Sequence, residues 1–96
     1  MKKTITNRSI IVNLIDDKLM RRLNRKYRGI NRSTDVLSFE IGEEGILGEV
    51  YISYPKAQRQ AEEYNCSLGE ELARLVGHGT LHLLGYKHKE MGKYGV

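Results

Sequence analysis

The segment from Ser67 to Gly85 restricts the fold more than any other stretch of this sequence. Ser67 and Glu70, three residues apart, form a capping-box pattern that starts a helix, and Gly85 is placed to end it. At about 100° per residue, one stripe of this helix is apolar, and it holds Leu68, Leu72, Leu75, Val76 and Leu83. Leu81 and Leu84 lie off the stripe, so the second half of the helix is apolar nearly all round. Such a helix is typically central and buried, which requires other elements around it.

Patterns upstream predict those elements. They are strands at 9–15, 34–41 and 48–54 and helices from Asp16 or Asp17 to Gly29 and from Pro55 onward, with 42–45 as the turn of a hairpin. In the first helix, Leu19, Leu23 and Tyr27 recur at a spacing of four, with Met20 adjacent, and predict its buried side. In the next helix, Ala57, Ala61 and Tyr64 predict the inner face. We therefore expect one domain over residues 1–96, of the α/β (α+β) class, with a small sheet packed against helices.

The three histidines of the chain are His78, His82 and His88. The first two are four residues apart on the predicted helix, so their side chains meet on one face about 5–6 Å apart at Cβ. Gly85 allows the chain to reverse, which brings His88 back toward the helix end. Three neutral imidazoles and a water fill a tetrahedral catalytic zinc site, although nickel, cobalt or iron could occupy the same positions. The alternative is that one histidine is a hydrogen-bonded core residue.

Glycine flanks His78 on both sides, as Gly77 and Gly79. Each glycine costs about 1 kcal/mol in a helix interior, so the pattern predicts a close approach by a strand or a substrate. Gly79 also stands where the H-E-x-x-H peptidases have their general base, which argues against peptide hydrolysis. A zinc-bound water has a pKa near about 7, so metal hydroxide could attack phosphorus or deprotonate an RNA 2′-hydroxyl.

Basic residues are concentrated in the stretch 21–32, which carries six basic side chains and no acidic one within a chain of net charge +4. A local positive patch suits the phosphates of RNA, and the alternative is a solvated helix face. The candidate RNA contacts are Arg25, Arg28 and Arg32, with Arg59 on the next helix.

The composition also indicates the cellular compartment of the protein. Cys66 is the only cysteine, so a disulfide within the chain is excluded and a reducing compartment is favoured. The amino terminus lacks the apolar run of a signal peptide, and no segment approaches the roughly 20 apolar residues of a membrane span. We expect a cytoplasmic protein with no membrane partner.

The histidine segment, "HGTLHLLGYKH", resembles the signature H-G-x-L-H-L-x-G-Y-D-H of the YbeY family of bacterial metal-dependent endoribonucleases and ribosomal RNA maturation factors. "LNRKYRGINRSTDVLSF" and "LGEVYIS" are similar to two further segments of that family, in the same order. The resemblance covers roughly residues 13–88. Lys87 departs from it, because the family has aspartate there, a carboxylate that could orient His88.

This resemblance implies a mixed four-stranded sheet with a central helix that carries the metal ligands. It implies one zinc ion bound by His78, His82 and His88, with the metal-held water as the reactive group. It implies a single-strand-preferring endoribonuclease that acts in 16S ribosomal RNA 3′-end maturation and ribosome quality control. Its partners would then be ribosomal RNA and the small ribosomal subunit.

Two other classes of function would also explain the three histidines. One is a metallohydrolase of peptides or small molecules, which leaves the basic stretch unexplained. The other is a non-catalytic, ribosome-associated metal protein, which Lys87 favours. Asp35 has two interpretations as well, a residue near the metal or one that caps a turn, and we favour the turn.

Overall fold

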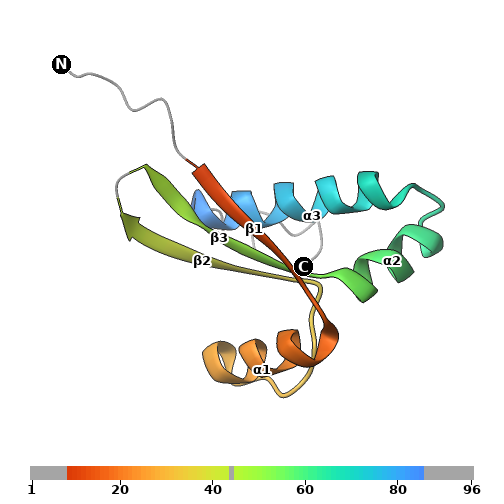
Figure 1. Cartoon of the computed structure of the whole chain (residues 1–96), viewed down its shortest axis with the longest axis horizontal. Coiled ribbons are helices and arrows are strands. Elements are labelled where there is room, and N and C mark those ends of the chain that lie inside the picture. Colours follow the sequence, from red (N-terminus) through yellow and green to blue (C-terminus); the bar gives the residue numbers. More distant parts are fainter. Residues whose placement is uncertain (1–8, 44, 86–96) are drawn as a thin grey trace.

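The structure is a computed structural model that describes residues 9–43 and 45–85. Its elements in chain order are β1 (Ser9–Ile15), α1 (Asp17–Arg28), β2 (Val36–Glu43), β3 (Ile46–Ser53), α2 (Tyr54–Glu63) and α3 (Leu68–Leu83) (Figure 1). The strand order is β1-β3-β2, with β1 parallel and β2 antiparallel to β3. The α+β class with a small mixed sheet is confirmed. The described residues form three strands, where the resemblance implied four.

The hairpin between β2 and β3 is tighter than the sequence predicts. The strands continue to Glu43 and resume at Ile46, so only the last two residues of the expected turn 42–45 lie outside them. Gly45 has φ 84°, the left-handed conformation that glycine adopts without a steric penalty. Strand pairing thus extends almost to the tip.

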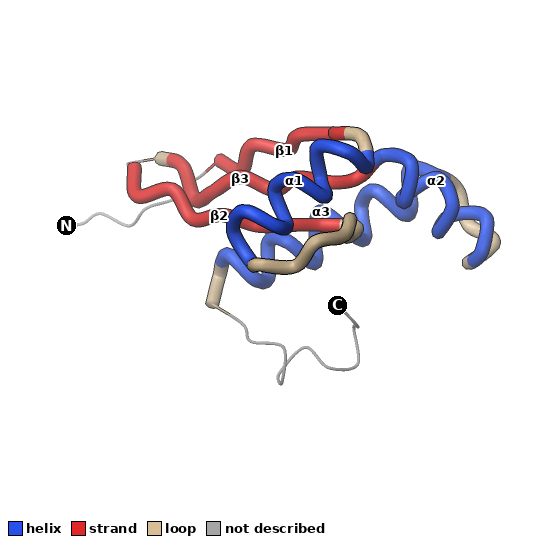
Figure 2. Tube along the Cα trace, turned by 90° about the horizontal axis from the view of Figure 1, so that it is seen from below, coloured by secondary structure: helices blue, strands red, loops and turns tan. Residues whose placement is uncertain are grey.

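Helices cover both faces of the sheet. On one face, an added Cβ at Gly48 of β3 would lie 2.6 Å from Leu83 Cδ2 of α3, so the Leu83 side chain packs directly on the β3 backbone. On the other face, the ring centroid of Tyr27 in α1 lies 5.0 Å from that of Phe39 in β2. Successive strand residues point to opposite faces, which places α1 and α3 on different sides of the sheet. Figure 2 shows α1 crossing over the sheet.

The core lies between the sheet, α2 and α3. Its buried residues are Val36, Val50, Ile52, Ala57, Leu75 and Leu83, with Leu68, Leu72 and Val76 packed against them. The predicted apolar stripe of α3 is therefore confirmed. The prediction that its second half is buried all round is wrong at Leu84, which is 58% exposed, because α3 packs only against the sheet and α2 in the described part of the chain. Tyr64, expected on the inner face of α2, is also exposed.

Helix α1 begins and ends as predicted, but its buried side differs. Asp16 is the N-cap, accepting from the Leu19 amide at 2.8 Å, and Gly29 ends the helix with φ 73°. Met20 is buried as predicted, but Asn24 is buried as well, while Tyr27 is 56% exposed. The cause is the loop after α1, which folds back so that the Asn24 amide donates to the Arg32 carbonyl at 2.7 Å. This contact turns a polar residue inward.

None of the helices that the structure describes could span a membrane. Each helix within residues 9–43 and 45–85 is too short or too polar to cross a bilayer.

Candidate metal centre and basic surface

The His78 and His82 rings lie side by side on α3. Their centroids are 5.5 Å apart and their planes are inclined by 31°. His78 is 6% exposed and His82 is half-buried. The capping box that starts this helix is present, with Ser67 and Glu70 exchanging both hydrogen bonds. The predicted juxtaposition of the two imidazoles is therefore found.

The third predicted ligand, His88, lies outside the described residues, as does Lys87. Within the described ranges, no three histidine, cysteine, aspartate or glutamate side chains come together as a metal site. The pair on α3 supplies two imidazole nitrogens of the kind that zinc prefers. The assignment of His78, His82 and His88 as one ligand set stays a prediction.

Gly79 fixes the position of the histidines relative to the sheet. An added Cβ there would lie 2.8 Å from Ser38 Oγ and 2.8 Å from Val50 Cγ1, so the predicted close approach of a strand is found. Gly48 on β3 permits a second close approach that the sequence patterns did not indicate. At Gly77, which is exposed, an added Cβ would meet nothing within 4 Å among the described residues, so no described strand approaches it and approach by a substrate stays a prediction.

A buried carboxylate lies earlier along the histidine side of α3. Glu71 is 1% exposed, and its two oxygens accept from Arg74 Nε at 3.1 Å and from an Arg74 terminal nitrogen at 2.5 Å. These hydrogen bonds raise the pKa of the Arg74 guanidinium. Because a guanidinium neutralises the carboxylate, Glu71 is committed to Arg74. Its i, i+3 spacing from Arg74 was a readable signal for this pair.

The basic residues of α1 and the following loop form two surface pockets. One, of about 280 Å³, is lined by Lys18, Arg21, Arg22 and Arg25. The other, of about 170 Å³, is lined by Asn24, Arg28, Ile30, Arg32, Ser33 and Thr34. The structure thus brings Arg28 and Arg32 together and places Arg25 in the neighbouring pocket.

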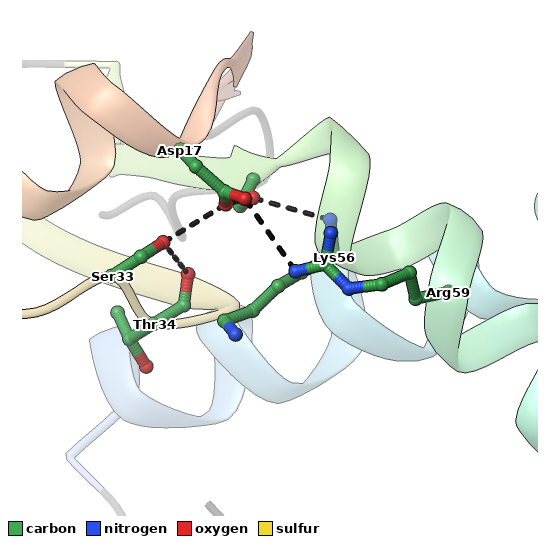
Figure 3. A network of polar contacts seen from close by, with 6 residues as sticks. Asp17, Ser33, Thr34, Lys56 and Arg59 are labelled. Carbon is green, nitrogen blue, oxygen red and sulfur yellow. Dashed lines mark hydrogen bonds and ion pairs between the residues drawn. The ribbon is translucent and has the colours of Figure 1, made fainter.

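Arg59 lies apart from these pockets and beside a carboxylate. Its guanidinium is 3.5 Å from Asp17 Oδ2, and both side chains are substantially exposed (Figure 3). Asp17 Oδ1 accepts from the Ser53 hydroxyl at 2.5 Å and from the Ser33 hydroxyl at 3.0 Å. The Ser53 hydrogen bond is the main reason that the pKa of Asp17 is lowered. Arg59 therefore offers phosphate less positive charge than an isolated arginine would.

Asp35 joins the start of β2 to the end of β3 and to α2. Its carbonyl accepts from the Ser53 amide at 2.9 Å, and Oδ2 accepts from the Gln60 amide at 3.4 Å. These contacts are those of a residue that holds a chain turn in place.

Comparisons with known proteins identify relatives over most of the chain. The family model described as Endoribonuclease YbeY matches residues 1–94. A protein of that name from Desulforamulus reducens is 50% identical over 84 residues, covering 77% of this chain and 55% of its own length. One from Aquifex aeolicus is 47% identical over 93 residues, covering 93% and 62%.

A solved structure shares the fold. The solution structure of a Thermotoga maritima protein matches with a TM-score of 0.63 and 33% identity, over 92% of this chain and 66% of that one. The chain spans about half to three fifths of the length of the curated relatives named above.

Proposed function

The chain belongs to the YbeY family of endoribonucleases, and from this premise we propose that it is a metal-dependent endoribonuclease acting on single-stranded RNA. The observation that carries the proposal is the His78–His82 pair, with ring centroids 5.5 Å apart on one helix. Imidazoles at this spacing bind one transition-metal ion from one helix. A buried helix pinned to a sheet keeps the two rings in register before any metal binds.

Zinc is the metal that we propose, with His78 and His82 as two of its ligands and His88 as the third. When bound, such an ion supplies Lewis acidity and lowers the pKa of a coordinated water toward about 7. The protein residues hold the imidazoles in place, and Gly79 leaves the position of a peptidase base without a carboxylate. Glu71 is occupied by Arg74 and does not substitute for that base.

Arg28 and Arg32 are the proposed phosphate contacts, because they line one pocket at the end of α1. Two guanidinium groups in one pocket can hold a phosphodiester by charge-assisted hydrogen bonds. Arg25 contributes from the adjacent pocket. Arg59 contributes less, because Asp17 lies beside it.

The biological role that we propose is 16S ribosomal RNA 3′-end maturation and ribosome quality control in the cytoplasm. Ribosomal RNA and the small ribosomal subunit would be the partners. The support is family membership together with the basic stretch 21–32, since a polyanionic partner suits a concentration of arginine.

The test compares two variants of α3. His82→Ala removes one proposed ligand, and Thr80→Ala changes a residue about 160° away around the same helix. Zinc bound per chain, measured by elemental analysis, and cleavage of a single-stranded RNA are read for both variants and for the unaltered protein. We expect His82→Ala to lose both zinc binding and RNA cleavage. Thr80→Ala should bind zinc and cleave RNA like the unaltered protein, and a chelator should stop its cleavage.

Each other outcome identifies an alternative. Zinc binding without RNA cleavage by the unaltered chain would point to a non-catalytic metal protein. Peptide hydrolysis that RNA does not inhibit would point to the other class of metallohydrolase. Full cleavage by His82→Ala would refute the assignment of the metal centre.

A further inference from the structure

We infer that Tyr27 is a stacking platform for one base of the single-stranded RNA, an inference that rests on the proposed function and specifies how that surface holds its substrate. Tyr27 is 56% exposed although it lies on the apolar side that the spacing of α1 predicts. An exposed aromatic ring on a basic surface is a usual contact of proteins that bind single strands.

A row of aromatic rings supports Tyr27 from behind. Its ring meets that of Phe39 edge to face, with centroids 5.0 Å apart. Phe39 meets Tyr51 in the same way at 5.7 Å. The Tyr51 hydroxyl donates to Glu49 at 2.6 Å, and Glu49 also accepts from Asn13 at 3.2 Å. The platform is therefore anchored across all three strands, which limits the entropy lost when a base stacks on it.

One cation lies at the ring, and a second follows in the sequence. Lys26 Nζ lies 5.2 Å from the Tyr27 centroid, and Arg28 follows in sequence and lines the pocket that also holds Arg32. The Lys26 side chain is long and flexible. When a base stacks on the ring, the ammonium can therefore leave the ring and bind a phosphate instead. Stacking and phosphate contact are thus available within one turn of α1.

The place of Tyr27 in the fold connects it with the histidines. Phe39, which supports Tyr27, belongs to β2, an outer strand of the described sheet. The preceding residue, Ser38, faces the other way and donates to the Gly79 carbonyl on α3, next to His78. A strand of RNA that crosses the edge of β2 would therefore pass from the stacking platform toward the candidate metal centre.

Tyr64 provides a matched control. It is 57% exposed and has Arg74 over its ring at 5.5 Å, so its exposure and cation contact resemble those of Tyr27. Its sequence neighbours Glu62 and Glu63 are acidic, whereas those of Tyr27 are Lys26 and Arg28. A probe at Tyr64 therefore reports on an exposed ring that lacks the basic setting.

The chain contains no tryptophan, so Tyr27→Trp and Tyr64→Trp each create a single fluorescent reporter. A short single-stranded 2′-O-methyl oligoribonucleotide, which lacks the free 2′-hydroxyl, is titrated into each variant. We expect quenching of the Tyr27→Trp emission and unchanged emission from Tyr64→Trp. A duplex of the same charge should leave the emission of both variants unchanged, because its bases are not available for stacking.

Affinity is the second readout. Tyr27→Leu should weaken binding of the single-stranded oligonucleotide by about tenfold, and Tyr27→Phe should retain affinity because the stacking face remains. Circular dichroism checks that each variant is folded. Binding that is equal for Tyr27→Leu and the unaltered chain, with no quenching in Tyr27→Trp, would overturn the stacking role while leaving the endoribonuclease proposal intact. If the unaltered chain neither binds nor cleaves RNA, both proposals fail.

Discussion

The Ser38 hydroxyl donates a hydrogen bond of 3.1 Å to the carbonyl of Gly79. The two residues are 41 positions apart, and the contact joins β2 to α3 one residue after His78. It is possible only because Gly79 lacks a side chain, since a Cβ would lie 2.8 Å from the same hydroxyl oxygen. The contact therefore sets the height of the histidine pair above the sheet.

Gly79→Ala should destabilise the protein. An added methyl group meets Ser38 Oγ and Val50 Cγ1, and overpacking of this kind costs about 1–3 kcal/mol. Alanine recovers about 1 kcal/mol of helix propensity, so we expect a net loss of up to about 2 kcal/mol in the free energy of unfolding. Urea denaturation followed by circular dichroism measures it. Because α3 must shift, zinc affinity should fall as well.

Gly77→Ala is the matched control for that prediction. Gly77 lies on the same helix, two residues earlier, and its added Cβ meets nothing within 4 Å. The variant should be more stable than the unaltered protein by up to about 1 kcal/mol, through helix propensity alone. Equal effects of the two alanines would show that the close approach at Gly79 is not sterically limiting.

Arg74→Met should lower the free energy of unfolding more than the substitution of a partly exposed arginine usually does. It leaves the carboxylate of Glu71, which is 1% exposed, without its guanidinium partner. A buried polar group left without its hydrogen-bond partner costs about 1–3 kcal/mol, and we expect a loss of that order because only the Glu71 end of this pair is buried. The free energy of unfolding from denaturant titration checks this.

Arg22→Met serves as the control for Arg74→Met, because Arg22 is exposed on α1 and should change stability by about 0.5 kcal/mol at most. The double variant Glu71→Met with Arg74→Met should recover most of the loss, since it removes the buried charge altogether. A double variant as unstable as Arg74→Met would contradict the role assigned to the buried charge.

Asp17→Asn should lower stability in a pH-dependent way. The pKa of Asp17 is lowered in the folded protein, chiefly by the Ser53 hydrogen bond, from an ordinary value of 3.8. A lowered pKa contributes stability above the ordinary value, and this contribution is lost as the pH falls through the folded-state pKa. Thermal unfolding should therefore separate the variant from the unaltered protein at neutral pH, and the separation should shrink below pH 3.8.

Glu63→Gln is the control for Asp17→Asn, because it removes an exposed carboxylate from α2. It should change the free energy of unfolding at neutral pH by about 0.5 kcal/mol at most, as exposed surface substitutions usually do. A constant difference between Asp17→Asn and the unaltered protein down to the lowest pH would mean that side-chain shape, not charge, matters at this position.

Local patterns in the sequence were sufficient for the elements and for the histidine pair. The capping box of α3 and the spacing of four between His78 and His82 are fixed by helix geometry alone. The buried side of α1 was not predictable in the same way, because a later loop carbonyl draws Asn24 inward. The partner of Gly79 depends on how a strand and a helix pack across the fold. Contacts of that kind are set by tertiary structure, which overrides local periodicity.

Zinc should raise the thermal stability of the protein, and chelation should reverse the rise. A ligand that binds only the folded state stabilises it by about 2.7 kcal/mol at a hundredfold excess over its Kd. For a domain of this size, that corresponds to a rise in Tm on the order of 10 °C or more. Thr80→Ala should show the same rise, because its side chain hydrogen-bonds within α3 to the Val76 carbonyl. His82→Ala should show almost none, and a full rise in that variant would place the zinc elsewhere in the chain.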